Sequence, residues 1–449
     1  MIVLTSQGEK IVIGDKPLSS GGEGEIHPIK NDDGRLRNCC AKIYYSKKRT
    51  QTLENKIRYM VDHPPSVVNN KNYMLGWPIE SLTDQEGHFI GFVMPLAFHG
   101  SKQLVVLTTL KLSKQLDGNW HERYDRNFVL SSTKARMKLL CNIAIPIHIL
   151  HATNQYVFVD LKPENILVTY DGRVSVVDVD SVQIMEQNRL LYPCTAATPN
   201  YMPPEHYVRQ SNDEIKLSSW ADFALGVLFY QVLVGLHPFV VTPRVVENDI
   251  NEIYRNIARE LFPFGKNRKE IQGYPPVHDF FLKLPQNIQK LFVRAFSGDA
   301  GIRPTAEEWG RNLHEALKTG NMMRMPHIQG KFICPLCKAK IVLKEDYVLV
   351  YRNQGYESAE KIELTSDNAY EWNGKSISHL NTCPKDGHVL MDYDELLHPE
   401  ARSLLEEEEI RKTEQVQVPD ENKNEGWGCL LMIIGSMLLT LLFFIKCVG

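Results

Sequence analysis

Four polar side chains interrupt an otherwise apolar stretch, residues 156–182, which reads "YVFVDLKPENILVTYDGRVSVVDVDSV". Asp160, Lys162 and Asn165 lie on one short segment between two apolar runs, and Asp178 ends the next expected strand. Phosphoryl transfer needs a carboxylate that accepts a hydroxyl proton, a cation near the moving phosphate, and oxygen ligands for magnesium. Because the four residues supply all of these groups, the stretch predicts phosphoryl-transfer chemistry.

A glycine cluster near the start of the chain, "LSSGGEGEIHPI", is typical of a hairpin turn that exposes backbone N–H groups. Such a loop can close over phosphates, although glycine-rich hairpins without a ligand are common. Its candidate binding residues are Ser19, Gly21, Gly22, Gly24 and Ile26. Lys42 follows Gly24 by 18 residues on an expected strand, where it either contacts phosphates or lies on a solvated strand face.

These motifs, in this order, resemble the eukaryotic-like Ser/Thr protein kinase family, in a divergent bacterial branch. "DLKPEN" is similar to that family's catalytic loop. Three later motifs resemble the end of its activation segment, its buried helix with Asp222 and the start of its last helix: "ATPNYMPPE" (197–205), "ADFALGV" (221–227) and "GIRPTAEEW" (301–309). The resemblance covers about 300 residues and implies an α+β, bilobal protein-kinase fold, in which Glu205 pairs with Arg303 inside the large lobe.

The resemblance implies how a nucleotide would be bound. The loop from Ser19 to Ile26 would cover the phosphates of ATP, and Lys42 would contact the α- and β-phosphates. Glu54, in "TLENKIRYM", would be the ion-pair partner of Lys42. The backbone of Pro95 and Leu96, in the inter-lobe link "VMPLA", would bind adenine.

It also implies how the phosphate would be transferred. Asp160 would orient and deprotonate the acceptor hydroxyl, and Lys162 would steady the γ-phosphate. Asn165 precedes Asp178 by 13 positions, the spacing of the family's magnesium motif, so both would hold Mg²⁺. Thr198 would form hydrogen bonds near Asp160 and Lys162.

The chain departs from the family pattern at several positions. Phe158 and Val159 replace the usual His-Arg pair before the catalytic aspartate, and that arginine usually receives an activation-segment phosphate. We therefore expect a kinase that is not switched by activation-loop phosphorylation. The magnesium motif reads "DVD", in which Asp180 replaces a glycine and should hinder a backbone flip.

Two other functions fit part of the pattern. A pseudokinase, which binds nucleotide or serves as a scaffold, is favoured by "DVD" and by Phe158 and Val159, but not by the retained Lys42 and Asp160. A small-molecule kinase would share the catalytic Asp and Asn but normally lacks "PPE" and the "RP" helix start.

Residues 326–395 contain a second cluster of chemically reactive side chains. Cys334 and Cys337 form "CPLC", a spacing that suits tetrahedral zinc, and Cys383 with His379 or His388 could complete a Cys₃His site around an intervening sheet. The alternatives are a knuckle without metal, buried cysteines, or a redox pair, although no thioredoxin-like pattern surrounds it.

The elements that must position these residues follow from residue periodicity. Residues 1–97 are mostly strand-like, with one helical pattern at about 48–62, and helical patterns dominate from about residue 132. We therefore predict a kinase-like domain at 1–325, divided into an N-lobe at about 1–97 and a C-lobe at about 98–325. The zinc-ribbon-like segment at 326–395 and a charged linker at 396–427 would follow.

The last segment predicts a membrane attachment. Residues 428–445 contain no charge over 18 residues, which as a helix would span about 27 Å, close to a hydrocarbon core. Basic residues before this segment favour a single-pass, C-terminal anchor with a cytoplasmic kinase domain. A buried core helix is the alternative.

The net charge of −3 gives no reason to expect nucleic acid as a partner. A protein substrate is expected instead. The resemblance also suggests a PPM-type phosphatase and a von Willebrand-type protein as partners, because bacterial relatives are often found with both.

Overall fold

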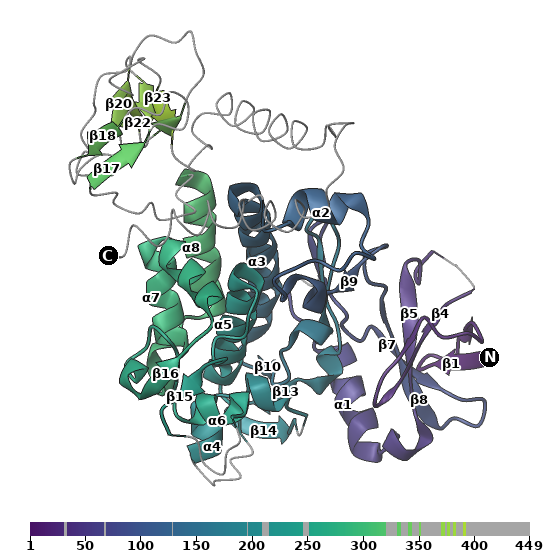
Figure 1. Cartoon of the computed structure of the whole chain (residues 1–449). Coiled ribbons are helices and arrows are strands. Elements are labelled where there is room, and N and C mark those ends of the chain that lie inside the picture. The colour runs from purple at the N-terminus through teal and green to yellow at the C-terminus, as the bar shows by residue number, and fades with distance from the viewer. Residues whose placement is uncertain are drawn as a thin grey trace, which may run out of the picture. The chain divides into compact units, whose positions relative to one another are not determined.

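The computed structural model describes residues 1–30, 34–66, 69–127, 129–194, 196–208, 215–245 and 251–319, together with seven short strands between residues 330 and 391. Contacts divide the chain into two units, Met1–Met322 and Met323–Gly449. The first unit holds every residue of the predicted phosphoryl-transfer site. Its β-rich and helix-rich parts lie on opposite sides of the ribbon (Figure 1).

The N-terminal part is a seven-stranded sheet with the order β2-β1-β7-β8-β5-β4-β3. Its strands are β1 (Ile2–Thr5), β2 (Lys10–Val12), β3 (Ser19–Ser20), β4 (Gly24–Pro28), β5 (Cys39–Tyr44), β7 (Glu80–Thr83) and β8 (Phe89–Pro95). Apolar side chains from these strands, including Val3, Ile43 and Val93, form the core of this part. The strand β5, which carries Lys42, lies between β4 and β8 and is therefore fixed on both sides.

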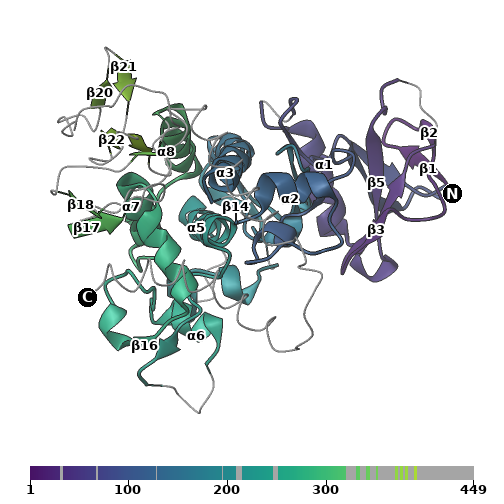
Figure 2. The same ribbon diagram turned by 45° about the horizontal axis from the view of Figure 1, so that its top comes forward.

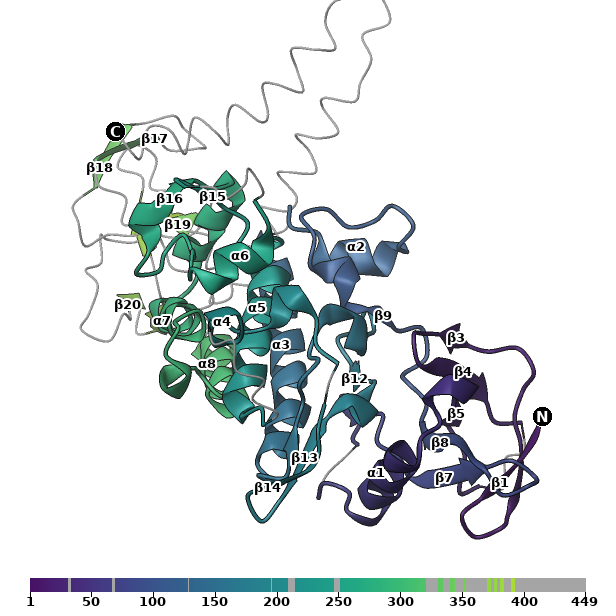
Figure 3. The same ribbon diagram turned by 90° about the horizontal axis from the view of Figure 1, so that it is seen from below.

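One helix, α1 (Gln51–Asp62), interrupts this sheet in the sequence. Thr50 caps it by accepting a hydrogen bond from the N–H of Leu53 at 3.2 Å. Its buried face contains Lys56, Ile57 and Met60. Seen from below, α1 lies beside the purple strands, at the border with the helical part (Figure 3).

The second part is helical, as the sequence predicted. Its helices are α2 (Gly118–Tyr124), α3 (Val129–His151), α4 (Pro204–Val208), α5 (Ser218–Val234), α6 (Ile253–Ala258), α7 (Gln286–Ala295) and α8 (Ala306–Thr319). α5 is apolar on all sides, which fits its burial by surrounding elements, and it ends at Gly235, whose φ of +89° is a left-handed C-cap. Figure 2 shows α3 and α5 side by side at the centre of this part.

Short strands flank the predicted site residues of the second part. They are β6 (Tyr73–Leu75), β9 (Lys102–Gln103), β10 (Tyr156–Val157), β11 (Ile166–Val168), β12 (Val174–Val176), β13 (Gln183–Glu186), β14 (Arg189–Tyr192), β15 (Thr242–Pro243) and β16 (Ile271–Gly273). β11 pairs with β12 so that Ile166 lies opposite Val176. This hairpin brings the residues before β11 next to those after β12.

Short 3₁₀ helices connect these elements. They cover Ser46–Lys48, Leu104–Leu107, Pro163–Asn165, Val179–Ser181, Pro199–Tyr201, Arg268–Glu270, Pro276–Lys283 and Ala300–Ile302. Two of them, Pro163–Asn165 and Val179–Ser181, follow the catalytic-loop and magnesium-motif aspartates predicted from the sequence.

The second unit contains paired strands. They are β17 (Gly330–Ile333), β18 (Lys340–Leu343), β19 (Val350–Tyr351), β20 (Tyr370–Trp372), β21 (Lys375–Ile377), β22 (Leu380–Thr382) and β23 (Val389–Met391). The predicted zinc ligands lie outside the described residues: Cys334, Cys337, His379 and Cys383. The predicted linker and membrane segment, 396–427 and 428–445, lie outside them too. In the part of the chain that the structure describes, no helix has the length and apolar character needed to cross a bilayer.

Candidate active site

Asp160 is held by two neighbouring donors. The Thr198 hydroxyl donates to Oδ1 of Asp160 at 2.7 Å, and Nζ of Lys162 lies 2.7 Å from Oδ2. Nζ of Lys162 also donates to the Thr198 hydroxyl at 3.1 Å. These contacts confirm the predicted hydrogen bonds of Thr198 with both residues. Since both oxygens of Asp160 accept from fixed donors, the carboxylate has a fixed orientation.

Asn165 and Asp178 are brought together by the β11–β12 hairpin. The N–H of Val177 donates to the backbone carbonyl of Asn165 at 2.9 Å. Nδ2 of Asn165 donates to the backbone carbonyl of Asp160 at 2.9 Å, which fixes the amide and leaves its side-chain oxygen as the group able to bind a cation. The side chain of Asp178 is 37% exposed. An amide oxygen and an accessible carboxylate on adjoining segments fit the oxygen ligands that Mg²⁺ prefers.

Asp178 has a left-handed backbone conformation, with a φ of 60° and a ψ of 31°. This conformation is uncommon for a residue other than glycine and is often retained at functional sites. The following turn supports it, because the backbone N–H and the hydroxyl of Ser181 both donate to the carbonyl of Asp178, at 3.1 and 2.7 Å.

Lys42 points from β5 toward these residues. Its Nζ donates to Oδ1 of Asp178 at 2.6 Å and lies 3.9 Å from a carboxylate oxygen of Glu23. The structure therefore brings Lys42 of the first part and Asp178 of the second part into direct contact. The side chain of Lys42 is only 7% exposed, which argues against a lysine on a solvated strand face.

Asp180 is a second partner of Lys42, which the sequence did not predict. Nζ of Lys42 donates to both carboxylate oxygens of Asp180, at 2.8 and 2.7 Å, and the Tyr44 hydroxyl donates to Oδ2. Burial alone would raise the pKa of Asp180, but the charge of Lys42 and the hydrogen bonds from Lys42 and Tyr44 outweigh it and lower that pKa. Asp180 is thus held as a carboxylate.

The predicted ion pair between Lys42 and Glu54 is wrong for this structure. Glu54 instead accepts from Nε and Nη2 of Arg58, at 3.0 and 2.8 Å, one turn later on α1. α1 contributes Lys56, whose Nζ donates to the backbone carbonyl of Asp180 at 2.6 Å. The physical reason is helix geometry, because Glu54 and Lys56 are two residues apart and cannot face the same way.

The glycine-rich loop forms the predicted hairpin between β3 and β4. Ser19 pairs with Ile26, and Ile26 lies opposite Lys42 in the neighbouring pair of strands. Gly21 and Gly22 are exposed at the turn. Gly24 has a structural role, because a Cβ there would lie 2.2 Å from the carbonyl oxygen of Ile43. Its glycine identity is therefore explained by strand packing, independently of any phosphate.

The link between the two parts differs in one respect from the prediction. Pro95 is the last residue of β8, and the N–H of Leu96 donates to the carbonyl of Asn38 at 2.7 Å. The backbone donor that we expected at Leu96 is thus already used within the first part. An adenine ring could use it only if this bond were exchanged, so adenine binding at Pro95 and Leu96 stays a prediction.

A buried ion pair in the helical part confirms another prediction. Arg303 donates from Nη1 and Nη2 to the two carboxylate oxygens of Glu205, at 2.8 and 2.6 Å. Asp222, on α5, is 3% exposed, and its Oδ1 has no hydrogen-bond partner. Burial raises the pKa of Asp222 to about 7, and the charge of Arg303 opposes this shift only in part.

Apolar contacts hold the segment between Asp178 and Glu205. Val157, Val159 and Trp220 form a buried cluster, against which the partly buried Cys194, Ala197 and Met202 pack. Nε1 of Trp220 donates to the backbone carbonyl of Val159 at 3.1 Å. Val159, at the position of the family's phosphate-binding arginine, therefore packs against the segment directly.

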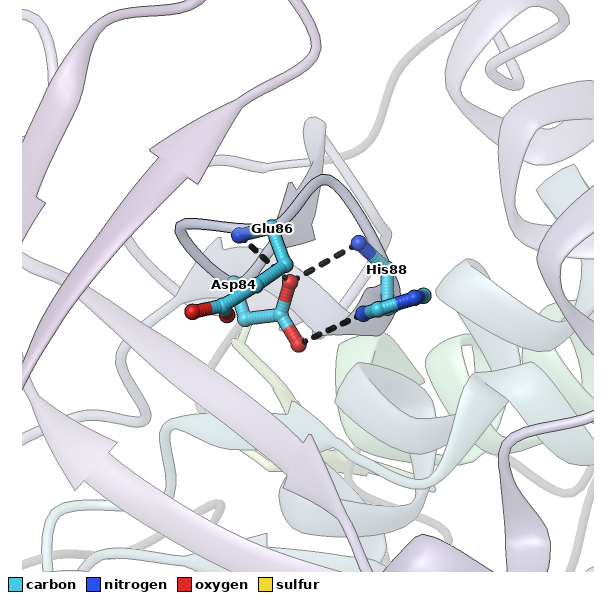
Figure 4. A group of neighbouring side chains, drawn as sticks. All are labelled: Asp84, Glu86 and His88. Carbon is cyan, nitrogen blue, oxygen red and sulfur yellow. Dashed lines mark hydrogen bonds and ion pairs between the residues drawn. The ribbon is translucent and has the colours of Figure 1, made fainter.

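A third group of polar side chains lies at the turn between β7 and β8 (Figure 4). Oδ1 of Asp84 accepts from the backbone N–H groups of Glu86 and His88, at 3.1 and 2.8 Å, and Oδ2 lies 3.3 Å from Nδ1 of His88. Gly87, with a φ of +87°, completes the turn. Because Asp84 uses its oxygens to close this exposed turn, we assign the group a structural role.

Comparison with known proteins agrees with this geometry. The family model of the protein kinase domain matches residues 97–313, which include Asp160, Lys162, Asn165 and Asp178. Residues 97–313 are therefore similar to the protein kinase domain. The sheet before this kinase domain and the helices within it fit the bilobal kinase fold predicted from the sequence.

Several protein kinases are similar to this chain. Protein kinase YegI of Escherichia coli K12 is 26% identical over 313 residues, which are 68% of this chain and 45% of that protein. YegI of E. coli O157:H7 is 26% identical over 343 residues, which are 74% of this chain and 49% of that protein. Serine/threonine-protein kinase gad8 of Schizosaccharomyces pombe is 28% identical over 179 residues, or 40% of this chain and 29% of that protein. These relatives support a protein Ser/Thr kinase.

The chain spans about half the length of the YegI proteins that it matches. The kinase-domain match begins at residue 97, so Lys42 and the glycine-rich loop lie before it. Their assignment depends on the geometry described above, in which Lys42 contacts Asp178 of the kinase domain.

Sequence reasoning missed Asp180 as a partner of Lys42, and it missed Tyr44 and Lys56 as the residues that bind Asp180. Asp180, Tyr44 and Lys56 are all buried and polar. Two signals pointed to them. Tyr44 lies two residues after Lys42 on the same strand face, and Asp180 is a charge in an apolar run that would need a buried partner.

Proposed function

We propose that the protein is an ATP- and Mg²⁺-dependent protein kinase that transfers the γ-phosphate to Ser or Thr hydroxyls of proteins. The observation that carries this proposal is the placement of Asp160, Lys162 and Thr198 in one hydrogen-bonded group, together with the direct contact between Lys42 and Asp178. Each group has the chemical character that phosphoryl transfer requires.

Asp160 would accept the proton of the acceptor hydroxyl. Its orientation is set by Thr198 and Lys162, which leaves its remaining lone pairs for the incoming hydroxyl. Lys162 is 24% exposed and can contact the moving phosphate from beside Asp160. The oxygens of Asn165 and Asp178 would hold Mg²⁺, which supplies neutralising charge to the phosphates when it is bound.

The decisive experiment measures transfer from γ-labelled ATP to a general protein acceptor by the purified full-length chain with Mg²⁺. The wild type should label Ser or Thr residues, and Asp160→Asn should lose about 10²–10⁴-fold in rate. Asp171→Asn is a matched control, because that carboxylate pairs with Arg173 outside the cleft. Equal rates for wild type and Asp160→Asn would contradict the mechanism.

A pseudokinase gives a different result in the same experiment. It would bind nucleotide, as measured by fluorescence of a labelled ATP analogue, but transfer no phosphate to itself or to the acceptor. Binding without transfer in the wild type would therefore replace the proposed enzyme by the scaffold alternative.

We further propose that activation-segment phosphorylation does not switch the enzyme. Support comes from the apolar cluster of Val157, Val159 and Trp220, which packs against the segment where an arginine would bind a phosphate. Burial raises the pKa of Cys194, in this segment, to about 11, so the thiol stays neutral at physiological pH. No charge on the segment is needed for this packing.

The C-terminal segment would attach the kinase to the cytoplasmic face of a membrane through a single pass. The proposal depends on the 18 uncharged residues of 428–445. Full-length protein should stay in the membrane fraction after alkaline extraction, whereas Leu438→Arg should weaken this retention, since a mid-segment charge costs about 3 kcal/mol. Complete extraction of the wild type would refute the anchor.

The four residues Cys334, Cys337, His379 and Cys383 would bind one Zn²⁺ ion. The metal content of the purified protein, measured by mass spectrometry, should be close to one zinc per chain and should fall in the double variant of Cys334→Ser and Cys337→Ser. A PPM-type phosphatase and a von Willebrand-type protein are proposed partners by resemblance alone. Co-purification of such proteins from the native host would support them.

A further inference from the structure

The ammonium group of Lys42 is bound mainly by Asp180. Its Nζ lies 2.8 and 2.7 Å from the two carboxylate oxygens of Asp180 and 2.6 Å from one oxygen of Asp178. The two aspartates differ in exposure, because the side chain of Asp180 is 2% exposed and that of Asp178 is 37% exposed. Asp178 can therefore be reached by a ligand, whereas Asp180 is shielded.

The other contacts of Asp180 fix its position. The Tyr44 hydroxyl donates to Oδ2, and Tyr44 is itself 1% exposed on the strand that carries Lys42. On the opposite side, Lys56 of α1 donates to the backbone carbonyl of Asp180 at 2.6 Å. A buried carboxylate is stable only when paired and hydrogen-bonded in this way.

α1 presents a cation to this site where the family pattern would place a carboxylate. Lys56 contacts Asp180, and Glu54 is directed to Arg58 through two hydrogen bonds. The carboxylate that balances Lys42 is instead supplied by the turn Val179–Ser181, directly after the magnesium-motif aspartate.

We propose that Asp180 is the positioning residue for Lys42, in place of Glu54, and that it keeps Lys42 in the cleft when a nucleotide-bound metal engages Asp178. This inference rests on the proposed function, since it concerns how that enzyme binds its nucleotide. Asp180 and Asp178 share one short turn, so the orientation of Lys42 is tied to the magnesium motif and not to a carboxylate on α1.

The arrangement has a specific consequence for metal dependence. With Asp180 present, Lys42 keeps a carboxylate partner after Asp178 turns to a metal ion. Without the charge of Asp180, Lys42 would have Asp178 as its main counter-ion and would compete with Mg²⁺ for that oxygen. Removal of the charge should therefore raise the Mg²⁺ concentration needed for nucleotide binding.

The test uses the full-length chain and a fluorescent ATP analogue, titrated at a series of Mg²⁺ concentrations. Asp180→Asn should raise the Mg²⁺ midpoint of binding by about tenfold, which corresponds to about 1.4 kcal/mol. Glu54→Gln tests the competing assignment and should move the midpoint by less than about twofold. A purely structural role of Asp180 would lower the thermal midpoint without changing this Mg²⁺ dependence.

Tyr44→Phe keeps the test decisive if Asp180→Asn does not fold. It removes one hydrogen bond to Asp180 and should shift the Mg²⁺ midpoint in the same direction by about three- to fivefold, in proportion to about 1 kcal/mol. An unchanged midpoint in Asp180→Asn, or in Tyr44→Phe where the first variant is unfolded, would overturn the proposal. So would a tenfold shift in Glu54→Gln.

Measuring nucleotide binding apart from phosphate transfer separates this inference from the proposed function. If the wild type binds the analogue but transfers no phosphate, the proposed catalysis fails, and the Mg²⁺ midpoints still decide the role of Asp180. If the wild type binds no nucleotide at any Mg²⁺ concentration, both proposals fail.

Discussion

Two regions of the first unit hold their functional segments by different physical means. The charged side chains of Lys42, Asp178 and Asp180 and the Tyr44 hydroxyl form one network that joins the two parts. Around Val159, the segment before Glu205 packs against an apolar cluster, in which Trp220 donates a hydrogen bond to the carbonyl of Val159. A charged network responds to the charge of a ligand, whereas an apolar contact does not.

The same contrast appears in two buried aspartates. The charge of Lys42 outweighs burial at Asp180 and lowers its pKa, while burial prevails over Arg303 at Asp222 and raises its pKa to about 7. Asp180 is therefore held as a carboxylate, whereas burial favours the protonated form of Asp222.

The largest loss of stability is expected when the apolar cluster around Trp220 is disrupted. Trp220→Ala should lower the free energy of unfolding by about 3–5 kcal/mol, because it removes a buried aromatic ring and the hydrogen bond to Val159. Chemical denaturation measures this change. Leu191→Ala, an exposed position on β14, is the control and should change stability by less than about 0.5 kcal/mol. Similar values for both variants would mean that the cluster does not hold the segment.

The next prediction concerns pH and Asp222. The pKa of Asp222 in the folded protein, about 7, lies above the ordinary value for aspartate. At a pH between these two pKa values, Asp222 is protonated in the folded protein and ionised in the unfolded chain. The contribution of Asp222 to stability is then present at low pH and is lost as the pH rises to about 7, at about 1.4 kcal/mol per pH unit.

Asp222→Asn cannot ionise and should remove this loss. Denaturation of the wild type and of Asp222→Asn should be measured at several pH values. As the pH rises to about 7, the free energy of unfolding of the wild type should fall relative to that of the variant, and above about pH 7 the difference should increase no further. Parallel curves over the whole range would show that Asp222 titrates in the same way in the folded and unfolded states.

A smaller loss of stability should follow from a substitution on β8, next to the strand β5 that carries Lys42. At Gly91 on β8, a Cβ would lie 1.9 Å from the carbonyl oxygen of Lys42, so Gly91→Ala must displace β5 or β8. We expect a loss of about 1–3 kcal/mol in stability, together with weaker nucleotide binding. Gly273→Ala is a matched control, because a Cβ there meets no atom within 4 Å. A stable Gly91→Ala protein with unchanged binding would show that β5 tolerates displacement.

The smallest effect is expected from dephosphorylation. If the segment before Glu205 is held without a bound phosphate, treatment of the purified protein with a Ser/Thr phosphatase should change its phosphotransfer rate by less than about twofold. Mass spectrometry before and after treatment checks that phosphate was removed. A loss of tenfold or more would show that the segment depends on a phosphate despite Val159.

The sequence predicted those parts of the site in which spacing along the chain fixes the geometry. Asp160, Lys162 and Thr198 meet as expected, Glu205 pairs with Arg303, and the β11–β12 hairpin joins Asn165 to Asp178. In each case a tight loop or a recurrent motif leaves few alternatives.

The partners of Lys42 were not predictable in the same way. Whether Glu54 or Lys56 faces the cleft depends on the rotation of α1 about its axis, and both belong to a generic amphipathic pattern. In the sequence, Asp180 was interpreted only as the replacement of a glycine in the magnesium motif. The structure shows that the turn Val179–Ser181 places its carboxylate against Lys42. Long-range pairs of this kind depend on the packing of the two parts and not on local sequence.

The central claim is that Lys42, Asp178 and Asp160 form one phosphoryl-transfer site. The most direct measurement is mass-spectrometric mapping of the residues that acquire phosphate when the full-length protein is incubated with ATP and Mg²⁺. We predict phosphorylated Ser or Thr residues with the wild type and none above background with Lys42→Met. Equal phosphorylation by wild type and Lys42→Met would contradict the account.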